Sequence, residues 1–410
     1  LSLIPRLFLR LRHCRPEVVH VNDGRMAISW ALPCLLAGVR LIIHQRTCLA
    51  PSRAYKFALL LASRVVSISE FTENSLPNWA KKKSRLLFNP FESVPIGTRS
   101  QVREDVRSEL ELGSDSRIIV FVGTIQEQKR PLVALKALAQ FRQSGGENAA
   151  LLMIGRISNE DRQTLSSMIE ELKLDNYVKI LGFRDDVSRF IMAADVLVAP
   201  AIGEGHGRVV VEAMLAGTPV VASASGGHLE IIEHRMSGLL FPPDDARALA
   251  DALLHLFVDS ENSARLSSNA FIATFQKYSK NKHASDMFLI YRQTLGRVAI
   301  VIESMGGGGA QQVVGQLLSK WVDRGDSPVL ITFNSNHDDS TVIPLGVELH
   351  RVDSQGPSNG WRQAVVANLA RLWRIRRAIK NTRARRVVSF VTATNVLAIL
   401  ATIGLRVKVI

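Results

Sequence analysis

Short apolar runs alternate with helix-length segments along most of the chain. Strands are predicted where Val, Ile and Leu dominate a short run, and helices where apolar residues recur with helical spacing. The predicted strands span residues 15–22, 39–44, 64–69, 117–125, 150–155, 177–183, 195–200 and 219–223, with a short strand and turn at 238–245. The predicted helices span residues 26–37, 54–63, 131–141, 162–172, 185–194 and 246–257, followed by a helical stretch over 262–294. This order predicts an α/β protein with parallel sheets and helices on both faces.

Two breaks divide this pattern. Residues 89–100 are rich in Pro, Gly and Ser, which predicts a linker between two domains. At Gly296 the pattern restarts with a strand over 297–303, a glycine-rich loop at 306–309, a helix and another strand, which predicts a fresh βαβ unit. The loop lacks the GxGxxG spacing with an acid about twenty residues on, so it gives little support to a dinucleotide-binding fold.

Residues 15–44 have a counterpart at 385–410. Both segments follow a basic helix, enter a Val-Val strand, pass through a helix of small residues and finish in a second strand. The separation of about 367 residues is far longer than a solenoid repeat and is the size of a complete two-domain enzyme. We therefore expect the chain to cover one period of a tandem protein. The likeness also favours a soluble strand–helix unit over a membrane span for the uncharged segment 387–405.

Composition narrows the function classes. The 410 residues are 47% hydrophobic and 21% charged, which permits two to three domains and argues against global disorder. The net charge of +14 gathers near residues 6–15 and 371–386. With 6% aromatic residues and no nucleic-acid motif, two interpretations stay open for these segments: amphipathic helices on an anionic membrane, and solvated helix faces. The three cysteines form no CxxC pair, which predicts reduced thiols in a cytoplasmic protein.

The stretch GEGHGRVVVEAMLAGTPVVAS (203–223) carries the candidate chemistry. It predicts a loop, a glycine-permitted turn, a helix and a buried strand. Gly205 and Gly207 let backbone N–H groups approach a ligand, and the helix that opens near Gly207 directs its positive end to the same place, which suits a phosphate. Glu204 lies in the loop, and the carboxylate of Glu212 in the first helical turns can accept hydrogen bonds from a sugar diol. Together these features suggest a nucleotide-sugar donor. The alternative is an ordinary amphipathic helix with solvated carboxylates.

The stretch resembles the E-x7-E signature of the family 4 retaining glycosyltransferases, which have the GT-B fold. The resemblance implies that Glu204 contacts and places the donor sugar, and that Glu212 accepts from the ribose hydroxyls. It also implies a front-face route, in which the acceptor attacks on the side from which the nucleotide leaves. We assign no nucleophile, because the two-carboxylate geometry of retaining glycosidases is not required by this spacing. His206 stands where Phe is commonest. We place it in the donor-binding set, and we interpret it as a spacer with a partly exposed ring rather than as a catalytic residue.

Further segments extend the resemblance. VGTIQEQKRP (122–131) looks like the first strand and loop of the family's donor domain, with Gly123 in the loop and Lys129 at the family lysine. Thr124 stands where many members have Arg, and Arg130 is a candidate to compensate. An ammonium at Lys129 stabilises the charge that grows on the leaving group. The donor-binding set is completed by Arg208 and by Gly226 and Gly227, whose lack of side chains suits close backbone approach. Glu230 is interpreted equally as a donor-side residue and as a solvated helix residue.

The acceptor side has weaker signals. His44 matches a strand-end histidine that often contacts the donor sugar or the acceptor side. Asn22 and Asp23 follow a strand, at the sheet edge where α/β proteins bind ligands. The loop at 306–309 resembles the GGAE-type loop that opens these enzymes, although glutamines stand at 311–312 where many members carry Glu-Arg. No constellation predicts a metal. The pair Asp185-Asp186 is interpreted as a helix N-cap, and the pair Asp244-Asp245 as a turn.

We therefore predict a metal-independent, retaining hexosyltransferase of the GT-B fold. Residues 1–88 would be the second half of an acceptor domain, 89–295 the donor domain with its closing helices, and 296–410 the first half of a second acceptor domain. The expected partners are a nucleotide sugar as co-substrate, with no resident cofactor, and a glycan or lipid-linked acceptor in cell-surface polysaccharide synthesis. The expected location is the cytoplasm or the inner face of the membrane. The alternatives are a nucleotide-sugar epimerase, a phosphorylase, and a catalytically impaired scaffold that binds nucleotide or membrane.

Overall fold

The computed structural model divides into two compact units, Leu1–Asp286 and Met287–Ile410. It describes residues 3–48, 52–91, 99–146, 148–306, 309–333, 343–352, 361–382, 384–390, 392–405 and 407–409. The predicted α/β class with parallel sheets is confirmed, because every strand pairing in these ranges that joins two named strands is parallel.

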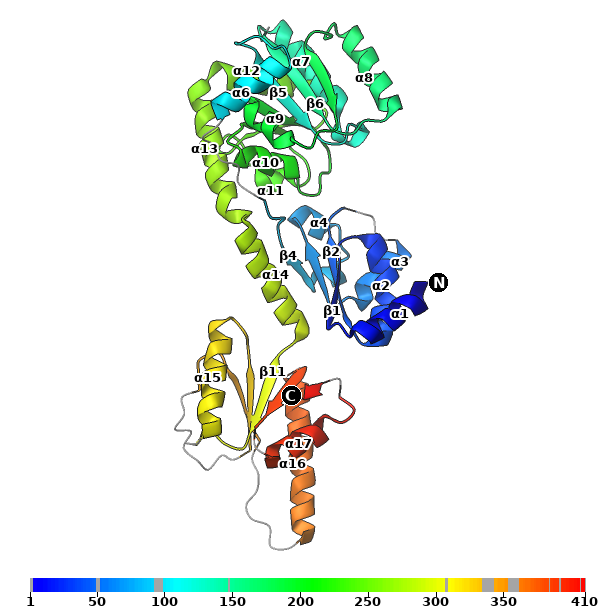
Figure 1. Ribbon diagram of the computed structural model, residues 1–410, viewed down its shortest axis with the longest axis vertical. Coiled ribbons are helices and arrows are strands. Elements are labelled where there is room, and N and C mark those ends of the chain that lie inside the picture. The colour runs from blue at the N-terminus through cyan, green and yellow to red at the C-terminus, as the bar shows by residue number, and fades with distance from the viewer. Residues whose placement is uncertain are drawn as a thin grey trace. The chain divides into compact units, whose positions relative to one another are not determined.

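The first 91 residues contain one parallel sheet within the described ranges, in the order β1-β2-β3-β4 (Figure 1). Its strands are β1 (Val18–Val21), β2 (Arg40–Gln45), β3 (Arg64–Ser67) and β4 (Ser84–Leu86). Its helices are α1 (Leu3–Cys14), α2 (Gly24–Ala37), α3 (Arg53–Leu61), α4 (Glu70–Asn74) and α5 (Asn78–Lys81). Ser69 caps α4 through a capping box.

The described residues from 99 to 295 contain a second parallel sheet, in the order β10-β9-β8-β5-β6-β7. Its strands are β5 (Arg117–Val122), β6 (Ala149–Ile154), β7 (Val178–Gly182), β8 (Val196–Ala199), β9 (Val220–Ser223) and β10 (Leu239–Phe241). Its helices are α6 (Arg99–Glu109), the 3₁₀ turn η2 (Glu127–Lys129), α7 (Pro131–Gln143), α8 (Asn159–Glu171), α9 (Val187–Ala193), α10 (Arg208–Leu215), α11 (His228–Ile231), α12 (Ala246–Val258), α13 (Ser260–Lys277) and α14 (Lys280–Leu295).

Strand β5 shows why the strands of this sheet are continuous apolar runs in the sequence. Ile119 and Phe121 belong to the core that includes residues of α7 and α12, whereas Ile118 and Val120 belong to the core that includes residues of α9, α10 and α13. Helices therefore cover both faces of the sheet (Figure 1). A strand buried on both faces has no polar alternation, which is typical of parallel sheets.

The unit Met287–Ile410 has its own parallel sheet in the described residues, in the order β13-β12-β11-β14-β15. Its strands are β11 (Val298–Ile302), β12 (Val329–Thr332), β13 (Glu348–Arg351), β14 (Arg386–Ser389) and β15 (Lys408–Val409), and its helices are α15 (Gly309–Asp323), α16 (Trp361–Asn381) and α17 (Thr392–Thr402). The glycines at 307–308 lie outside the described residues. Like β1-α2-β2, the run β14-α17-β15 is a parallel strand–helix–strand unit, and Gly38 and Gly404 end their helices with φ near +70°.

Some elements were not predicted. Strand β4 has only three residues with a charged centre, so no apolar run marks it. Helix α6 covers part of the predicted linker, because its sequence RSQVREDVRSE offers apolar residues only at Val102 and Val106; residues 92–98 of that linker lie outside the described ranges. The predicted helical stretch over 262–294 is broken between α13 and α14, where Phe91 crosses and donates its N–H to the carbonyl of Tyr278 at 2.9 Å.

Candidate functional site

The loops that follow β5 and β8 meet where the strand order of the second sheet reverses. Strand β5 pairs with β6 on one side and with β8 on the other. The Ile202 N–H in the loop after β8 donates to the carbonyl of Gln128 in the loop after β5, at 3.3 Å. In an open parallel sheet the crevice at such a point, outside the carboxyl ends of the strands, is where ligands bind.

Helix α10 begins in this crevice. Its N-cap, Gly207, has φ of +74°, a conformation that glycine adopts without steric cost. A Cβ at this position would also lie 2.8 Å from Cδ2 of His228. The turn exposes the first N–H groups of α10, which carry partial positive charge and attract anions.

A cavity of about 230 Å³ lies beside the start of α10. It brings together six residues that the sequence predicted for the donor site: Gly123, Lys129, Glu204, Gly207, Arg208 and Glu212. The Lys129 ammonium donates to the Glu204 carboxylate, and Arg208 Nη2 lies 3.3 Å from Glu212 Oε1. Burial raises the pKa of Glu212, while the charge of Arg208 lowers it. The cavity thus presents two cations and two carboxylates.

His228 also lines this cavity, and sequence reasoning missed it. Its side chain is buried, with Nδ1 3.2 Å from the carbonyl oxygen of Ser223. Burial lowers the pKa of His228, so the ring is neutral at pH 7, and a proton on Nδ1 would satisfy that carbonyl. Its place directly after Gly226 and Gly227 is the signal that could have identified it.

Thr124 and Arg130 do not line the cavity. Thr124 is exposed, and Arg130 pairs with Asp244 at 2.9 Å and with Glu127 at 3.5 Å. The charge of Arg130 is therefore already matched by carboxylates. Its assignment to the donor stays a prediction that this cavity does not support.

The interpretation of His206 as a spacer with a partly exposed ring is wrong. Its side chain is 2% exposed, and its ring centroid lies 5.8 Å from that of Phe88, 6.2 Å from that of Phe91 and 5.4 Å from that of Tyr278. Neither ring nitrogen has a hydrogen-bond partner among the described residues. Burial lowers the pKa of His206 to about 4, with smaller contributions from Lys277, Arg208 and His228. The ring therefore acts as an aromatic core residue.

Gly226 and Gly227 hold the loop that carries Glu204. The Gly227 N–H donates to the carbonyl of Glu204 at 2.8 Å. A Cβ on Gly226 would lie 2.6 Å from that carbonyl oxygen, and a Cβ on Gly227 would lie 2.7 Å from Cα of His206. Both glycines therefore allow a close backbone approach to the neighbouring loop, and their binding of a donor stays a prediction.

Glu230 bridges the two sheets of the first unit, which neither interpretation of this residue anticipated. Its carboxylate accepts from the backbone N–H groups of Glu70 at 2.7 Å and Phe71 at 2.6 Å, at the start of α4. Nearby, the Ser69 hydroxyl donates to the carbonyl of Gly205. The loops around the cavity are therefore bonded directly to residues 69–71 of the first sheet's domain.

We expect Glu230→Ala to lower the free energy of unfolding of the protein by about 1–3 kcal/mol, because it removes a charged acceptor from two N–H groups. Urea unfolding monitored by circular dichroism measures this change. Glu233→Ala is the control, since Glu233 is exposed and three residues away. Equal stability of the two variants would show that the Glu230 bridge contributes nothing.

The predicted acceptor-side residues lie on the first sheet's domain. Asp23 caps α2 by accepting from the Met26 N–H at 2.8 Å, and Asn22 Oδ1 accepts from Arg46 at 3.4 Å. His44 is fully buried and stacks on His20 with ring centroids 5.3 Å apart. Burial lowers the pKa of His44 to about 3, helped by the charges of Arg46, His20 and His283. An acceptor role for these residues stays a prediction, and the carboxylate of Asp23 is already engaged by its helix.

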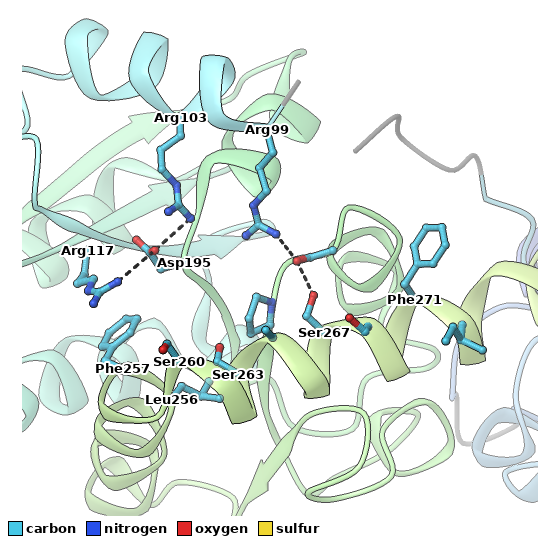
Figure 2. A pocket seen from close by; sticks show the side chains of 15 residues that line it. Arg99, Arg103, Arg117, Asp195, Leu256, Phe257, Ser260, Ser263, Ser267 and Phe271 are labelled. Carbon is cyan, nitrogen blue, oxygen red and sulfur yellow. Dashed lines mark hydrogen bonds and ion pairs between the residues drawn. The ribbon is translucent and has the colours of Figure 1, made fainter. Parts of the chain in front are cut away.

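A larger cavity of about 630 Å³ lies at the opposite, amino-terminal ends of β5, β8 and β9 (Figure 2). Figure 2 shows Arg103 and Arg117 on either side of Asp195, with N–O distances of 3.0 and 3.8 Å. Arg99 donates to the carbonyls of Gly217 and Ala194, where α10 and α9 end. These guanidinium groups stabilise helix C-termini and a buried carboxylate, so we do not take this cavity as the candidate site.

Within the described residues, no three His, Cys, Asp or Glu side chains are placed to hold a metal ion.

Known proteins resemble this chain in the segment that contains the 230 Å³ cavity. Residues 102–272 match the model of the family described as Glycosyl transferases group 1. The matched segment contains every residue that lines the 230 Å³ cavity. An uncharacterized glycosyltransferase, MJ1607 of Methanocaldococcus jannaschii, is 28% identical over 251 residues, which cover 59% of this chain and 61% of that protein. A D-inositol 3-phosphate glycosyltransferase of Nocardioides is 31% identical over 193 residues, 43% of this chain and 42% of that protein. The chain thus spans less than two thirds of the length of these two relatives.

The solved structures establish the fold. Alr3699/HepE of Anabaena, determined in complex with UDP, superimposes with a TM-score of 0.65 and 22% identity, covering 71% of this chain and 82% of that one. The predicted GT-B fold, with its Rossmann-like parallel sheets, is therefore confirmed.

Proposed function

We propose that this protein is a retaining glycosyltransferase that takes a sugar from a nucleoside diphosphate donor bound in the 230 Å³ cavity. The observation that carries the proposal is the convergence of Lys129, Glu204, Arg208 and Glu212 on one cavity at the start of α10. The match of residues 102–272 to group 1 glycosyl transferases supports it, as do the UDP and UDP-glucose complexes of the Anabaena protein.

Each residue has a proposed role. The diphosphate lies against the N-terminus of α10, where free N–H groups and the helix dipole favour negative charge. Lys129 turns from Glu204 to the departing phosphate and stabilises the charge that develops as the glycosidic bond breaks. Glu204, released from Lys129, accepts from hydroxyls of the donor sugar and places its anomeric carbon. Glu212 accepts from the ribose hydroxyls. The proposed reaction is metal-independent because Lys129 supplies the positive charge at the leaving group.

We expect a nucleoside diphosphate to raise the melting temperature of the protein, and Glu212→Ala to reduce that rise. A ligand at about 100 times its dissociation constant stabilises the folded state by about 2.7 kcal/mol. A thermal-shift screen with UDP, GDP, ADP and their common sugars measures the effect. The exposed Glu171, on α8, supplies the control Glu171→Ala, which should keep the full shift. Absence of any shift in the wild-type protein would contradict the proposed donor site.

The acceptor is proposed to be a glycan or a lipid-linked glycan in cell-surface polysaccharide synthesis. The retaining course and this context rest on the resemblance of 122–131 and 203–230 to family 4.

We further propose that residues 296–410 begin a second acceptor domain of a tandem protein. The shared strand–helix–strand topology of β1-α2-β2 and β14-α17-β15 supports this proposal.

A cytoplasmic or peripheral membrane location is also proposed. Helix α1 carries arginines at 6, 10 and 12, and α16 carries Arg371, Arg374, Arg376 and Arg377, which suit an anionic surface. No helix in the described ranges is both long enough and apolar enough to cross a membrane.

A further inference from the structure

The charges around the cavity are balanced before any donor binds. Lys129 and Arg208 face Glu204 and Glu212, and Arg130 outside the cavity is paired with acids. Thr124 contributes no charge where many family members have a cation. A bound diphosphate would therefore bring negative charge that these residues do not fully match, so a further cation is needed near the start of α10.

Arg46 lies close to this position. It directly follows β2, at the carboxyl edge of the first sheet. A Cβ placed on Gly205 would lie 3.1 Å from the carbonyl oxygen of Arg46, so the backbone of Arg46 packs against the loop that carries Glu204. This contact joins the two domains of the first unit beside the 230 Å³ cavity.

The guanidinium of Arg46 is held by neutral groups. Nη1 donates to Asn89 Oδ1 at 3.0 Å, and Nη2 donates to Asn22 Oδ1 at 3.4 Å. Across the described residues, Arg46 forms no ion pair with a carboxylate, and its side chain is exposed. Two amide oxygens orient the guanidinium without neutralising it, which leaves its charge available to a ligand.

Arg208 lies near the Arg46–Asn89 pair, because its guanidinium carbon is 4.9 Å from the ring centroid of Phe91, two residues after Asn89. It is the first residue of α10, and its side chain is 60% exposed. Although Arg46 is largely exposed, the part of it that is buried lowers its pKa, and the positive charge of Arg208 lowers that pKa further. Two like charges at the mouth of a cleft repel one another, and an anion between them removes that repulsion.

We propose that Arg46 and Arg208 together bind a phosphate group of the nucleoside diphosphate donor, so that Arg46 supplies the charge that Thr124 lacks. This inference rests on the proposed function. It makes donor binding depend on both domains of the first unit, because Arg46 follows β2 and Arg208 begins α10. A phosphate carried by the acceptor would offer the same chemistry, and the experiment separates these two sources.

Titration calorimetry with UDP and with uridine tests the proposal on the full chain. We expect Arg46→Gln to weaken UDP binding about 10-fold and to leave uridine binding unchanged, because only UDP carries phosphate. Arg46→Lys should recover part of the loss, since it keeps the charge without the guanidinium fork. Arg25→Gln is the control, because Arg25 is exposed on α2 of the same domain. The melting temperature of each variant checks that it is folded.

The possible outcomes test the role of Arg46 and the proposed function separately. If the wild-type protein binds UDP and Arg46→Gln binds it equally well, the inference is overturned while the proposed function stands. If UDP affinity is unchanged but the KM of a phosphorylated acceptor rises, the phosphate belongs to the acceptor and the inference is likewise overturned. If the wild-type protein binds UDP no better than uridine, both the proposed function and the inference fail.

Discussion

Lys129→Gln is expected to lower kcat for sugar transfer by about 10²- to 10³-fold, the usual cost of removing one electrostatic stabiliser of a transition state. Lys129 lines the cavity and donates to the Glu204 carboxylate, at the place where the proposed function has the leaving group depart. The charge on the departing phosphate is largest in the transition state, so the loss should appear in kcat more than in donor affinity. Steady-state kinetics with the sugar nucleotide chosen by the binding screen measures both.

Lys136→Gln provides the matched control, because Lys136 is exposed on α7, seven residues further along the chain. It should retain wild-type kcat. A loss of less than about threefold for Lys129→Gln, in a protein that melts at the wild-type temperature, would remove Lys129 from the mechanism.

Acidification from pH 7 to pH 5 is expected to lower the free energy of unfolding by about 4 kcal/mol through His44 and His206 together. Burial lowers the pKa of His44 to about 3 and that of His206 to about 4. The unfolded chain binds protons at these residues below about pH 6.5, whereas the folded chain does not. Their contribution to stability is therefore complete above pH 6.5, and it falls with pH toward 4 for His206 and toward 3 for His44.

The variant His206→Phe isolates one of these contributions. It keeps an aromatic ring beside Phe88, Phe91 and Tyr278 and removes the titrating group. The loss of stability between pH 7 and pH 5, measured by urea unfolding, should shrink by about 2 kcal/mol. The exposed His13 supplies the control His13→Gln, which should leave the loss unchanged. An undiminished loss in His206→Phe would mean that His206 is protonated in the folded protein at pH 5.

Much of the domain built on the six-stranded sheet could be predicted, because its sequence signals are local. Apolar runs marked β5, β6, β8 and β9, since parallel strands covered on both faces must be apolar throughout. The spacing of Glu204 and Glu212 could be interpreted because one turn at Gly207 brings a loop residue and a helix residue to the same cavity. Because β5 pairs with β8, the loop after β5, which contains Lys129, lies beside the loop that contains Glu204.

The remaining features depend on contacts between distant segments. Nothing local to Glu230 shows that its carboxylate accepts from Glu70 and Phe71, because the partners are about 160 residues away. His206 was misinterpreted for the same reason, since Phe88 and Tyr278, whose rings lie beside it, precede and follow it by many residues in the chain. Arg46 escaped notice because a single arginine after a strand carries no motif. Its significance appears only beside Gly205 and Arg208.

A crystal structure of the protein with UDP tests the central claim most directly. The account predicts UDP in the 230 Å³ cavity, with its ribose hydroxyls hydrogen-bonded to Glu212 and its diphosphate at the start of α10 beside Lys129. UDP bound instead in the arginine-lined cavity of Figure 2, or a 230 Å³ cavity left without nucleotide at saturating UDP, would contradict it.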